Sequence, residues 1–361
     1  MKSDPHLRFI AVVIAASVGV ACGGDSGSGS TAPIVPVVNA DTFPLRTLAQ
    51  QAGIRIGSAG DRGFRWTGTD GSTFRAILGR EFSVLTPEND MKFDHLHPAQ
   101  ATYYFAGADS LVAFAQQNQM AVRGHTLVWH QQLPKWITSG SFGADEAAQQ
   151  LIDHVTTVVS HFKGKVFAWD VVNEAFNDDG SRRSAYWLDH IGRNYIELAF
   201  RTARAADPDV ALFYNDYNVE GINTKSDSVY AMVKDFLARG VPITGVGLQS
   251  HFILNGVPAT LGANIARFVA LGVKVHVTEL DVRVPVPSTS ASLATQAQNY
   301  HDVVMTCIQN KGCELVTMWG FTDKDSWVPG TFPGFGDALP WDSSFQQKPA
   351  YKSIYNALAG R

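Results

Sequence analysis

From residue 42 onward, short apolar runs rich in β-branched residues alternate with longer segments of helical periodicity. The helical segments carry apolar residues three and four positions apart, as in 147–162 and 229–237. The apolar runs have the length of strands rather than of helices. There are eight of them, at 54–60, 82–89, 121–130, 166–175, 211–218, 245–252, 275–282 and 315–323.

This alternation predicts an α/β protein built as a single (β/α)8 TIM barrel. The composition does not change after residue 41, and barrels of this class often reach about 250 residues or more as one domain. The chain has 361 residues, of which 45% are hydrophobic, so it can fill a large core. We therefore expect residues 42–361 to form one domain.

The N-terminal residues differ from the rest of the chain. Residues 1–22 are typical of a lipoprotein signal peptide, because a basic start precedes an apolar run at 9–20 that is too short to cross a membrane. Cys22 resembles an acylated lipoprotein cysteine, and ordinary signal-peptidase cleavage is the alternative. Residues 23–41 are rich in Gly and Ser and then in Pro and Val, which predicts a flexible linker.

These features predict an exported protein. A cell-surface or outer-membrane lipoprotein is the first expectation, and a secreted or periplasmic protein is the alternative. Any membrane contact would then be made only through the lipid on Cys22. Two further cysteines, Cys307 and Cys313, lie six residues apart where a helix turns into a strand. In an oxidising compartment we expect them to form a disulfide, with two free thiols as the alternative.

Charge and composition narrow the choice of partner. The formal net charge is −4 and the isoelectric point is about 6.2, so the chain has no basic field for nucleic acid. Aromatic residues make up 11% of the chain and include eight tryptophans, which suits a surface that stacks on sugar rings. We expect a monomer that binds a neutral polymer and uses no cofactor and no metal.

Polar side chains gather where the predicted strands end. Glu174 ends the fourth run with Asn173 before it, and Glu279 lies in the seventh run with Asp281 on the same face of the strand. In a barrel these ends meet at one face. Cleavage of a glycosidic bond needs one protonated and one ionised carboxyl group, so this pair predicts a glycosidase. Taken singly, either glutamate could be no more than a solvated strand end.

Two histidines in the third run raise the question of a metal site. His125 and His130 lie five residues apart in a segment that we expect to be extended. Their side chains should then point to opposite faces, so we predict no metal there.

From about residue 42 to its end, the chain resembles glycoside hydrolase family 10, the endo-1,4-β-xylanases. It departs from the family pattern at Phe93, where tryptophan is common, and in the loop 338–347. The resemblance rests on TPENDMKF (86–93), VRGHTLVWHQQLP (122–134), WDVVNEA (169–175), NDYN (215–218), GLQSH (247–251), VTELDV (277–282), TMWGFTDKDSW (317–327) and KPAYKSIYNAL (348–358).

The resemblance implies endo-acting, retaining hydrolysis of xylan and xylo-oligosaccharides. Glu174 is similar to the family's acid/base and Glu279 to its nucleophile. Asn173 would bond the 2-hydroxyl of the sugar under attack, while His251 would bond the nucleophile with Asp281 fixing its protonation state. Further residues similar to substrate-binding positions are Glu88, Asn89, Lys92, His125, Trp129, Gln132, Tyr217, Gln249, Trp319 and Trp327.

Within this set, the resemblance assigns ENDMK (88–92) to the sugar two places from the cleavage point. It assigns HTLVWHQQ (125–132) to the sugar next to the scissile bond. The two late tryptophans would form an aromatic wall that excludes the hydroxymethyl group of glucose, and Tyr217 would be a platform on the leaving-group side. Two other functions stay open. One is a broader-specificity or exo-acting β-1,4-glycanase, and the other is an inactive barrel that binds polysaccharide.

Overall fold

The computed structural model describes residues 43–361. The predicted signal peptide (1–22), the candidate lipidation site Cys22 and the predicted linker (23–41) lie outside the described residues.

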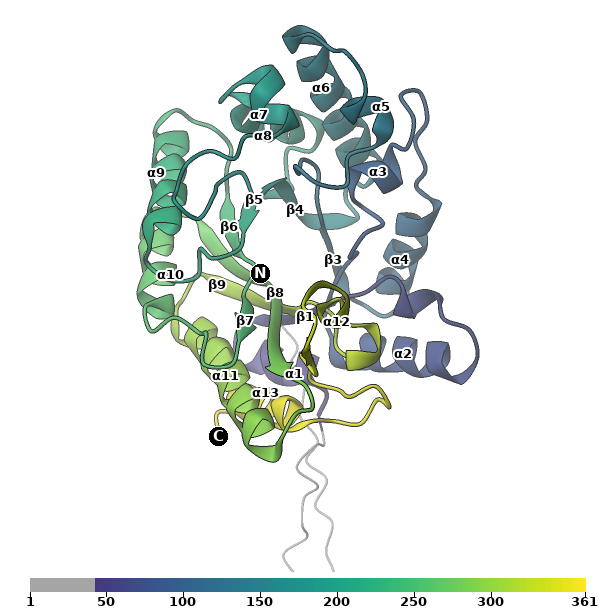
Figure 1. Ribbon diagram of the computed structural model, residues 1–361, viewed down its shortest axis with the longest axis vertical. Helices are drawn as coiled ribbons and strands as arrows, with labels where there is room; N and C mark the ends of the chain where they lie inside the picture. The colour runs from purple at the N-terminus through teal and green to yellow at the C-terminus, as the bar shows by residue number, and fades with distance from the viewer. Residues whose placement is uncertain (1–42) are drawn as a thin grey trace, which may run out of the picture. The chain divides into compact units, whose positions relative to one another are not determined.

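Eight parallel strands close into a barrel (Figure 1). Each strand pairs with its neighbour in sequence order, and the last, β9, pairs with β1 to complete the ring. The predicted single (β/α)8 barrel is therefore confirmed. The barrel strands are β1 (Arg55–Ala59), β2 (Val84–Thr86), β3 (Ala121–Gly124), β4 (Val166–Asn173), β5 (Ala211–Asp216), β6 (Gly245–Leu248), β8 (Lys274–Pro285) and β9 (Cys313–Met318).

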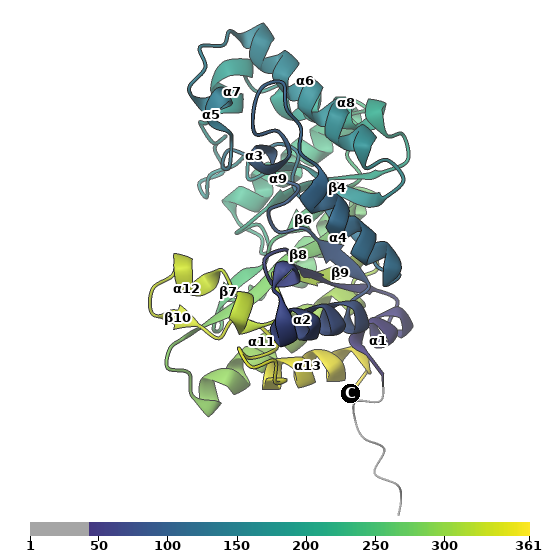
Figure 2. The same ribbon diagram turned by 90° about the vertical axis from the view of Figure 1, so that its right-hand side faces the viewer.

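Strand β8 is longer than its neighbours and continues past the barrel. Its second half pairs with two short extra strands, β7 (His251–Ile253) in parallel and β10 (Phe335–Gly336) antiparallel. Figure 2 shows β10 and the short helix α12 (Val328–Thr331) projecting on the same side as β7. This extension brings His251 opposite Asp281 in the ladder.

Helices surround the barrel because each buries one apolar stripe against the strands. In α6 (Ala144–His161), residues Leu151, Val155 and Val158 are fully buried, while Glu146 accepts from the backbone N–H of Gly143 at 2.9 Å and caps the helix start. The other helices are α1 (Leu45–Gln51), α2 (Gly68–Glu81), α3 (Phe93–Leu96), α4 (Ala106–Gln117), α5 (Lys135–Thr138), α7 (Tyr186–Ile191), α8 (Tyr195–Ala206), α9 (Thr224–Ala238), α10 (Leu261–Ala270), α11 (Ser290–Gln309), α13 (Pro349–Leu358) and the 3-10 turns η1 (Gly63–Arg65) and η2 (Asp323–Asp325).

The predicted disulfide is present. Cys307 in the last turn of α11 is bonded to Cys313 at the start of β9, with Cα atoms 5.2 Å apart. The disulfide therefore links α11 covalently to β9, the strand that closes the barrel. Among the helices of residues 43–361, none combines the length and the apolar character needed to cross a membrane.

Two predicted strands end earlier than expected. The run 121–130 is a strand only as far as Gly124, and the run 245–252 breaks after Leu248 before resuming at His251. Ser250 has a φ of 67°, which an extended ladder cannot accommodate. His125 and His130 lie beyond the end of β3, so strand alternation does not govern the directions of their side chains. The prediction that this segment is extended was wrong. Within residues 43–361, no group of three or more His, Cys, Asp or Glu side chains is placed to hold a metal ion.

Candidate active site

A cleft of about 680 Å³ lies over the carboxyl ends of the barrel strands. Both glutamates, Glu174 and Glu279, line it, and Asp281 lies fully buried behind its wall. All the other predicted site residues also line it: Glu88, Asn89, Lys92, His125, Trp129, Gln132, Asn173, Tyr217, Gln249, His251, Trp319 and Trp327.

Glu279 lies in β8 with only 4% of its surface exposed. Its Oε1 accepts from Nδ2 of Asn215 at 2.7 Å, and its Oε2 lies 3.2 Å from Nε2 of His251. Burial alone would raise the pKa of this carboxyl group, but His125, His251 and Asn215 outweigh burial and hold the pKa of Glu279 below its ordinary value. The site therefore keeps Glu279 ionised.

His251 connects Glu279 to a second carboxylate. Its Nδ1 lies 2.9 Å from Oδ2 of Asp281, an oxygen that also accepts from Nε1 of Trp327 at 2.7 Å. Burial works against the imidazolium, yet the charge and hydrogen bond of Asp281, with the hydrogen bond to Glu279, raise the pKa of His251 to about 10. At neutral pH, His251 is thus a cation that donates to both carboxylates.

Glu174 directly follows β4 in a left-handed backbone conformation, with a φ of 58°. Its backbone N–H donates to the carbonyl of Asn215 at 2.9 Å, which anchors this turn to the neighbouring strand. Its Oε1 accepts from Nε2 of Gln249 at 2.9 Å and from Nδ2 of Asn173 at 3.2 Å. The nearest histidine, His130, lies farther away, with Nδ1 3.8 Å from Oε2. The hydrogen-bond donors to the Glu174 carboxyl group are thus neutral amides.

Three amide side chains link the two glutamates. Oδ1 of Asn173 accepts from Nδ2 of Asn215 at 2.9 Å and from Nε2 of Gln249 at 3.2 Å. Thr278 donates to Oδ1 of Asn215 at 2.7 Å, so the other end of that amide must face Asn173 and Glu279. Our prediction did not include Asn215 as a site residue. Its position in NDYN, at the end of the fifth run, was the available signal.

A second group of polar and charged side chains lines the cleft near the segment that follows β2. Lys92 donates to Oδ1 of Asn89 at 3.1 Å, and its ammonium lies 4.9 Å from the ring centre of Trp129. Gln132 donates to the same Asn89 oxygen at 3.4 Å. Burial lowers the pKa of Lys92 and raises the pKa of Glu88 to about 8. Glu88, Asn89, Lys92 and Gln132 all line the cleft.

Three more aromatic rings, those of Tyr217, Trp319 and Trp327, line the cleft. Trp319 follows β9 and meets the ring of His125 edge-on at 5.1 Å, and the ring of Trp327 lies 4.9 Å from that of His251. Tyr217, after β5, accepts from Nη2 of Arg183 at 2.8 Å. These rings therefore approach the glutamates from β5, β9 and the segment after β9.

Buried ionisable side chains support His125 inside the barrel. Nδ1 of His125 lies 3.0 Å from Oδ2 of Asp170, whose other oxygen pairs with the guanidinium of Arg123. Arg123 also reaches Nδ1 of His276 at 2.8 Å across the barrel. Our prediction missed these side chains. The available signal was an ionisable residue, Arg123, Asp170 or His276, flanked by apolar residues within each of three predicted strands.

A (β/α)8 barrel with two buried glutamates at its strand ends has the architecture of a glycoside hydrolase. Residues 44–357 match the model of the family described as Glycosyl hydrolase family 10. The chain belongs to this family.

Characterised relatives cover most of the chain. Endo-1,4-beta-xylanase B of Thermotoga neapolitana is 45% identical over 313 residues, which span 86% of this chain and 90% of the relative. Endo-1,4-beta-xylanase D of Talaromyces funiculosus is 48% identical over 322 residues, or 88% of this chain and 77% of the relative.

Solved structures agree with the family assignment. Native xylanase 10B from Thermotoga maritima superposes with a TM-score of 0.86 at 45% identity, covering 88% of this chain and 98% of that one. Xylanase 10B from Thermotoga petrophila RKU-1, solved in complex with xylobiose, has a TM-score of 0.86 at 44% identity, with the same coverage of both chains.

Proposed function

We propose that this protein is an endo-1,4-β-xylanase that hydrolyses internal bonds of xylan with retention of anomeric configuration. The observation that carries the proposal is the unequal environment of two buried glutamates in one cleft. Glu279 receives a cationic donor and an amide donor, while the carboxyl group of Glu174 receives only neutral amide donors. Glycosidases need this division between an ionised and a protonated carboxyl group.

In the first step, Glu279 attacks the anomeric carbon and Glu174 gives its proton to the leaving oxygen. This step produces a glycosyl-enzyme ester on Glu279. In the second step, Glu174 takes a proton from water, and that water displaces Glu279 from the sugar. Two inversions give net retention. Asn173 bonds the 2-hydroxyl, a bond that strengthens as positive charge develops on the sugar ring.

The cleft on either side of the glutamates binds the chain. Glu88, Asn89 and Lys92 contact the sugar two places from the cleavage point, and they offer it an acceptor, an amide and a cation. His125, Trp129 and Gln132 contact the sugar next to the scissile bond, together with Gln249. His251 acts through Glu279, and Asp281 acts through His251.

Specificity for xylose comes from the aromatic wall. Trp319 and Trp327 stack on the flat face of a pentose, and their bulk leaves no room for the hydroxymethyl group of glucose. Tyr217 forms a platform for the sugar on the leaving-group side. Xylan and xylo-oligosaccharides are therefore the proposed substrates.

Product profiles on xylan, on cellulose and on short xylo-oligosaccharides test the proposal. An endo-acting xylanase releases mixed xylo-oligosaccharides early, lowers xylan viscosity rapidly and leaves cellulose intact. Release of xylose alone from the start would identify an exo-acting enzyme, and attack on cellulose a broader glycanase. Binding without any product would identify an inactive polysaccharide-binding barrel.

We further propose that the protein is exported and anchored by a lipid. The support is the signal-like composition of residues 1–22, the position of Cys22 at the end of the apolar run and the Gly/Ser/Pro composition of 23–41. A linker of this composition would let the barrel reach polymeric substrate beyond the membrane surface. The lipid would then hold the protein at the membrane, and the barrel alone would carry out catalysis.

A further inference from the structure

The turn that carries Glu174 is held through its backbone as well as through its side chain. Its φ of 58° lies in the left-handed region, which residues with a side chain rarely adopt. The backbone N–H of Glu174 donates to the carbonyl of Asn215, and its carbonyl accepts from Nε of Arg183, each at 2.9 Å. The next backbone N–H, that of Ala175, donates to the hydroxyl of Tyr214 at 2.9 Å. This last bond ends on a tyrosine that has no role in the proposed function.

Tyr214 lies behind the cleft rather than in it. It belongs to β5, where alternation places Tyr214 and Asp216 on the face opposite Asn215. Tyr214 is fully buried, and neither it nor Asp216 lines the cleft. The hydroxyl donates its single proton to Oδ2 of Asp216, so toward the backbone N–H of Ala175 it can only accept. The position of Asp216 therefore fixes the direction in which the tyrosine accepts.

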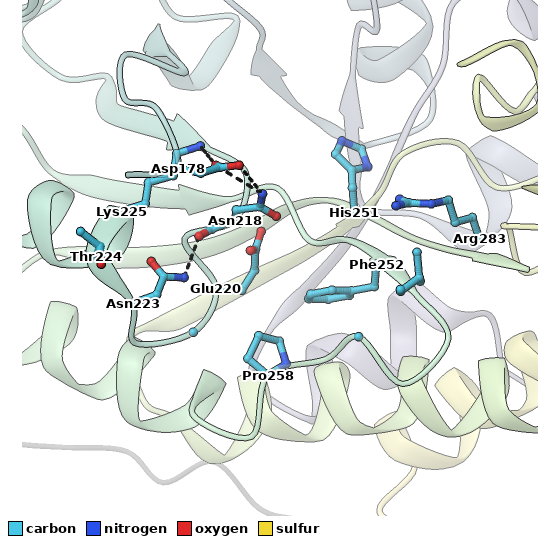
Figure 3. A pocket seen from close by; sticks show the side chains of 13 residues that line it. Asp178, Asn218, Glu220, Asn223, Thr224, Lys225, His251, Phe252, Pro258 and Arg283 are labelled. Carbon is cyan, nitrogen blue, oxygen red and sulfur yellow. Dashed lines mark hydrogen bonds and ion pairs between the residues drawn. The ribbon is translucent and has the colours of Figure 1, made fainter. Parts of the chain in front are cut away.

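Asp216 is in turn held by a buried cation. Its Oδ1 accepts from Nζ of Lys225 and from the backbone N–H of Tyr217, each at 2.9 Å. The side chain of Asp216 is 0% exposed and that of Lys225 is 1% exposed. Lys225 also donates to Oδ1 of Asp178 at 3.3 Å, an interaction drawn in Figure 3. A buried ion pair adds little net stability, because desolvation offsets the attraction, so stability alone does not explain this pair.

On the basis of the proposed function, in which Glu174 is the acid/base, we propose that Tyr214 is a positioning residue for it. Asp216 and Lys225 orient the hydroxyl group of Tyr214. An acid/base must be aligned first with the leaving oxygen and then with water. Glu174 follows the end of β4, so its alignment depends on the hydrogen bonds of the turn. Glu279 lies within β8, where the strand itself holds its backbone. Tyr214 therefore supports proton transfer and not the nucleophile.

Tyr214→Phe removes the hydroxyl group and keeps the ring. The test compares kcat/KM on a xylo-oligosaccharide, whose leaving group needs a proton, with kcat/KM on an aryl xyloside, whose low-pKa phenol needs none. The variant should lower kcat/KM on the xylo-oligosaccharide about tenfold and change that on the aryl xyloside less than about twofold, because general acid catalysis serves only the first. A less stable fold alone would lower both values equally.

Tyr300→Phe is the matched control. Tyr300 is also a fully buried tyrosine, but it lies on α11, and its hydroxyl donates to the carbonyl of Ala338 at 2.7 Å. This variant should leave the ratio of the two kcat/KM values unchanged. Asp216→Asn removes the charge that orients the hydroxyl of Tyr214 and should change the ratio in the same direction as Tyr214→Phe. An unchanged ratio there would refute the role given to Asp216.

A series of aryl xylosides with phenols of increasing pKa gives a second measurement. In the wild type, kcat/KM should depend weakly on the phenol pKa, because Glu174 protonates the departing oxygen. The dependence should be steeper in Tyr214→Phe and steepest in Glu174→Ala.

Equal losses on both substrates, or a ratio and a phenol dependence like those of the wild type, would overturn the proposal for Tyr214. A different result would count against the proposed function itself. If Glu174→Ala lowers both substrates equally, Glu174 is not the proton donor.

Discussion

The side-chain amide of Asn215 donates to Oε1 of Glu279 at 2.7 Å, with Thr278 fixing which end of the amide faces the carboxylate. A donor held in this way stabilises Glu279 as an anion without carrying charge itself. It also ties the β5 and β8 strands together at the point where the proposed reaction takes place.

Asn215→Ala should therefore reduce kcat/KM on xylan by about 10-fold to 100-fold, the usual range for a hydrogen bond to a charged group. Far-UV circular dichroism should show an intact barrel. Gln298→Ala is the control, because Gln298 is an exposed amide that bonds only Asp302 within α11. A loss no larger than that of the control would contradict a role for Asn215 in the site.

The two glutamates should be separable by leaving group. Glu174→Ala should lower the rate on xylan by about 10²-fold to 10⁴-fold, the usual share of general acid catalysis. An aryl xyloside with a good leaving group should still form the intermediate, and added azide should rescue turnover with retention. Glu279→Ala should lose both substrates, and azide should rescue it with inversion. Identical behaviour of the two variants, or reversed stereochemistry, would refute the assigned roles.

The pH profile on xylan should be bell-shaped, because activity needs an ionised Glu279 and a protonated Glu174. The pKa of Glu279 lies below its ordinary value, so its charge is lost only at low pH, and this loss sets the acid limb. His251, with a pKa of about 10, stays cationic throughout the acid and neutral range.

His251→Asn removes that cation while burial of Glu279 continues to favour its neutral form. The acid limb of kcat/KM should then move to higher pH by about one unit. His190→Asn, outside the cleft, should leave the limb in place. An acid limb that is the same in all three proteins would show that His251 does not control the charge of Glu279.

The disulfide between Cys307 and Cys313 closes a loop of sequence separation 6. The chain-entropy model assigns a loop of this length a stabilisation of about 2 kcal/mol. The double variant Cys307→Ala, Cys313→Ala should thus melt a few degrees lower and keep its activity. Reducing agent should lower the melting temperature of the wild type and leave that of the variant unchanged. An unchanged wild-type melting temperature would argue against any contribution to stability.

Cys22→Ser should move the protein from the membrane fraction to the soluble fraction of the expressing cells, while kcat/KM on soluble xylan stays the same. The reason is that the proposed anchor lies outside the barrel that carries the site. Metabolic labelling with a fatty acid should mark the wild type and not the variant. A wild type that is unlabelled and already soluble after export would refute lipidation.

The sequence by itself determined the eight strands and their order. Parallel strands in a barrel bring their carboxyl ends together, so the pair Asn173 and Glu174 at the end of one strand was expected to meet Glu279 on another. Alternation of strand residues between two faces placed Asp281 on the same face as Glu279.

Only the tertiary structure decided what each carboxyl group is bonded to. Asn215 and Glu279 are 64 residues apart, Gln249 and Glu174 are 75 apart, and Arg123 and His276 are 153 apart. Whether such groups lie within hydrogen-bonding distance depends on strand register and on backbone turns. One residue shows this well: Ser250, with its φ of 67°, breaks the sixth run and lets β7 carry His251 to β8. Hydrogen bonding weakens steeply with distance and angle, so ionisation states follow from the assembled fold.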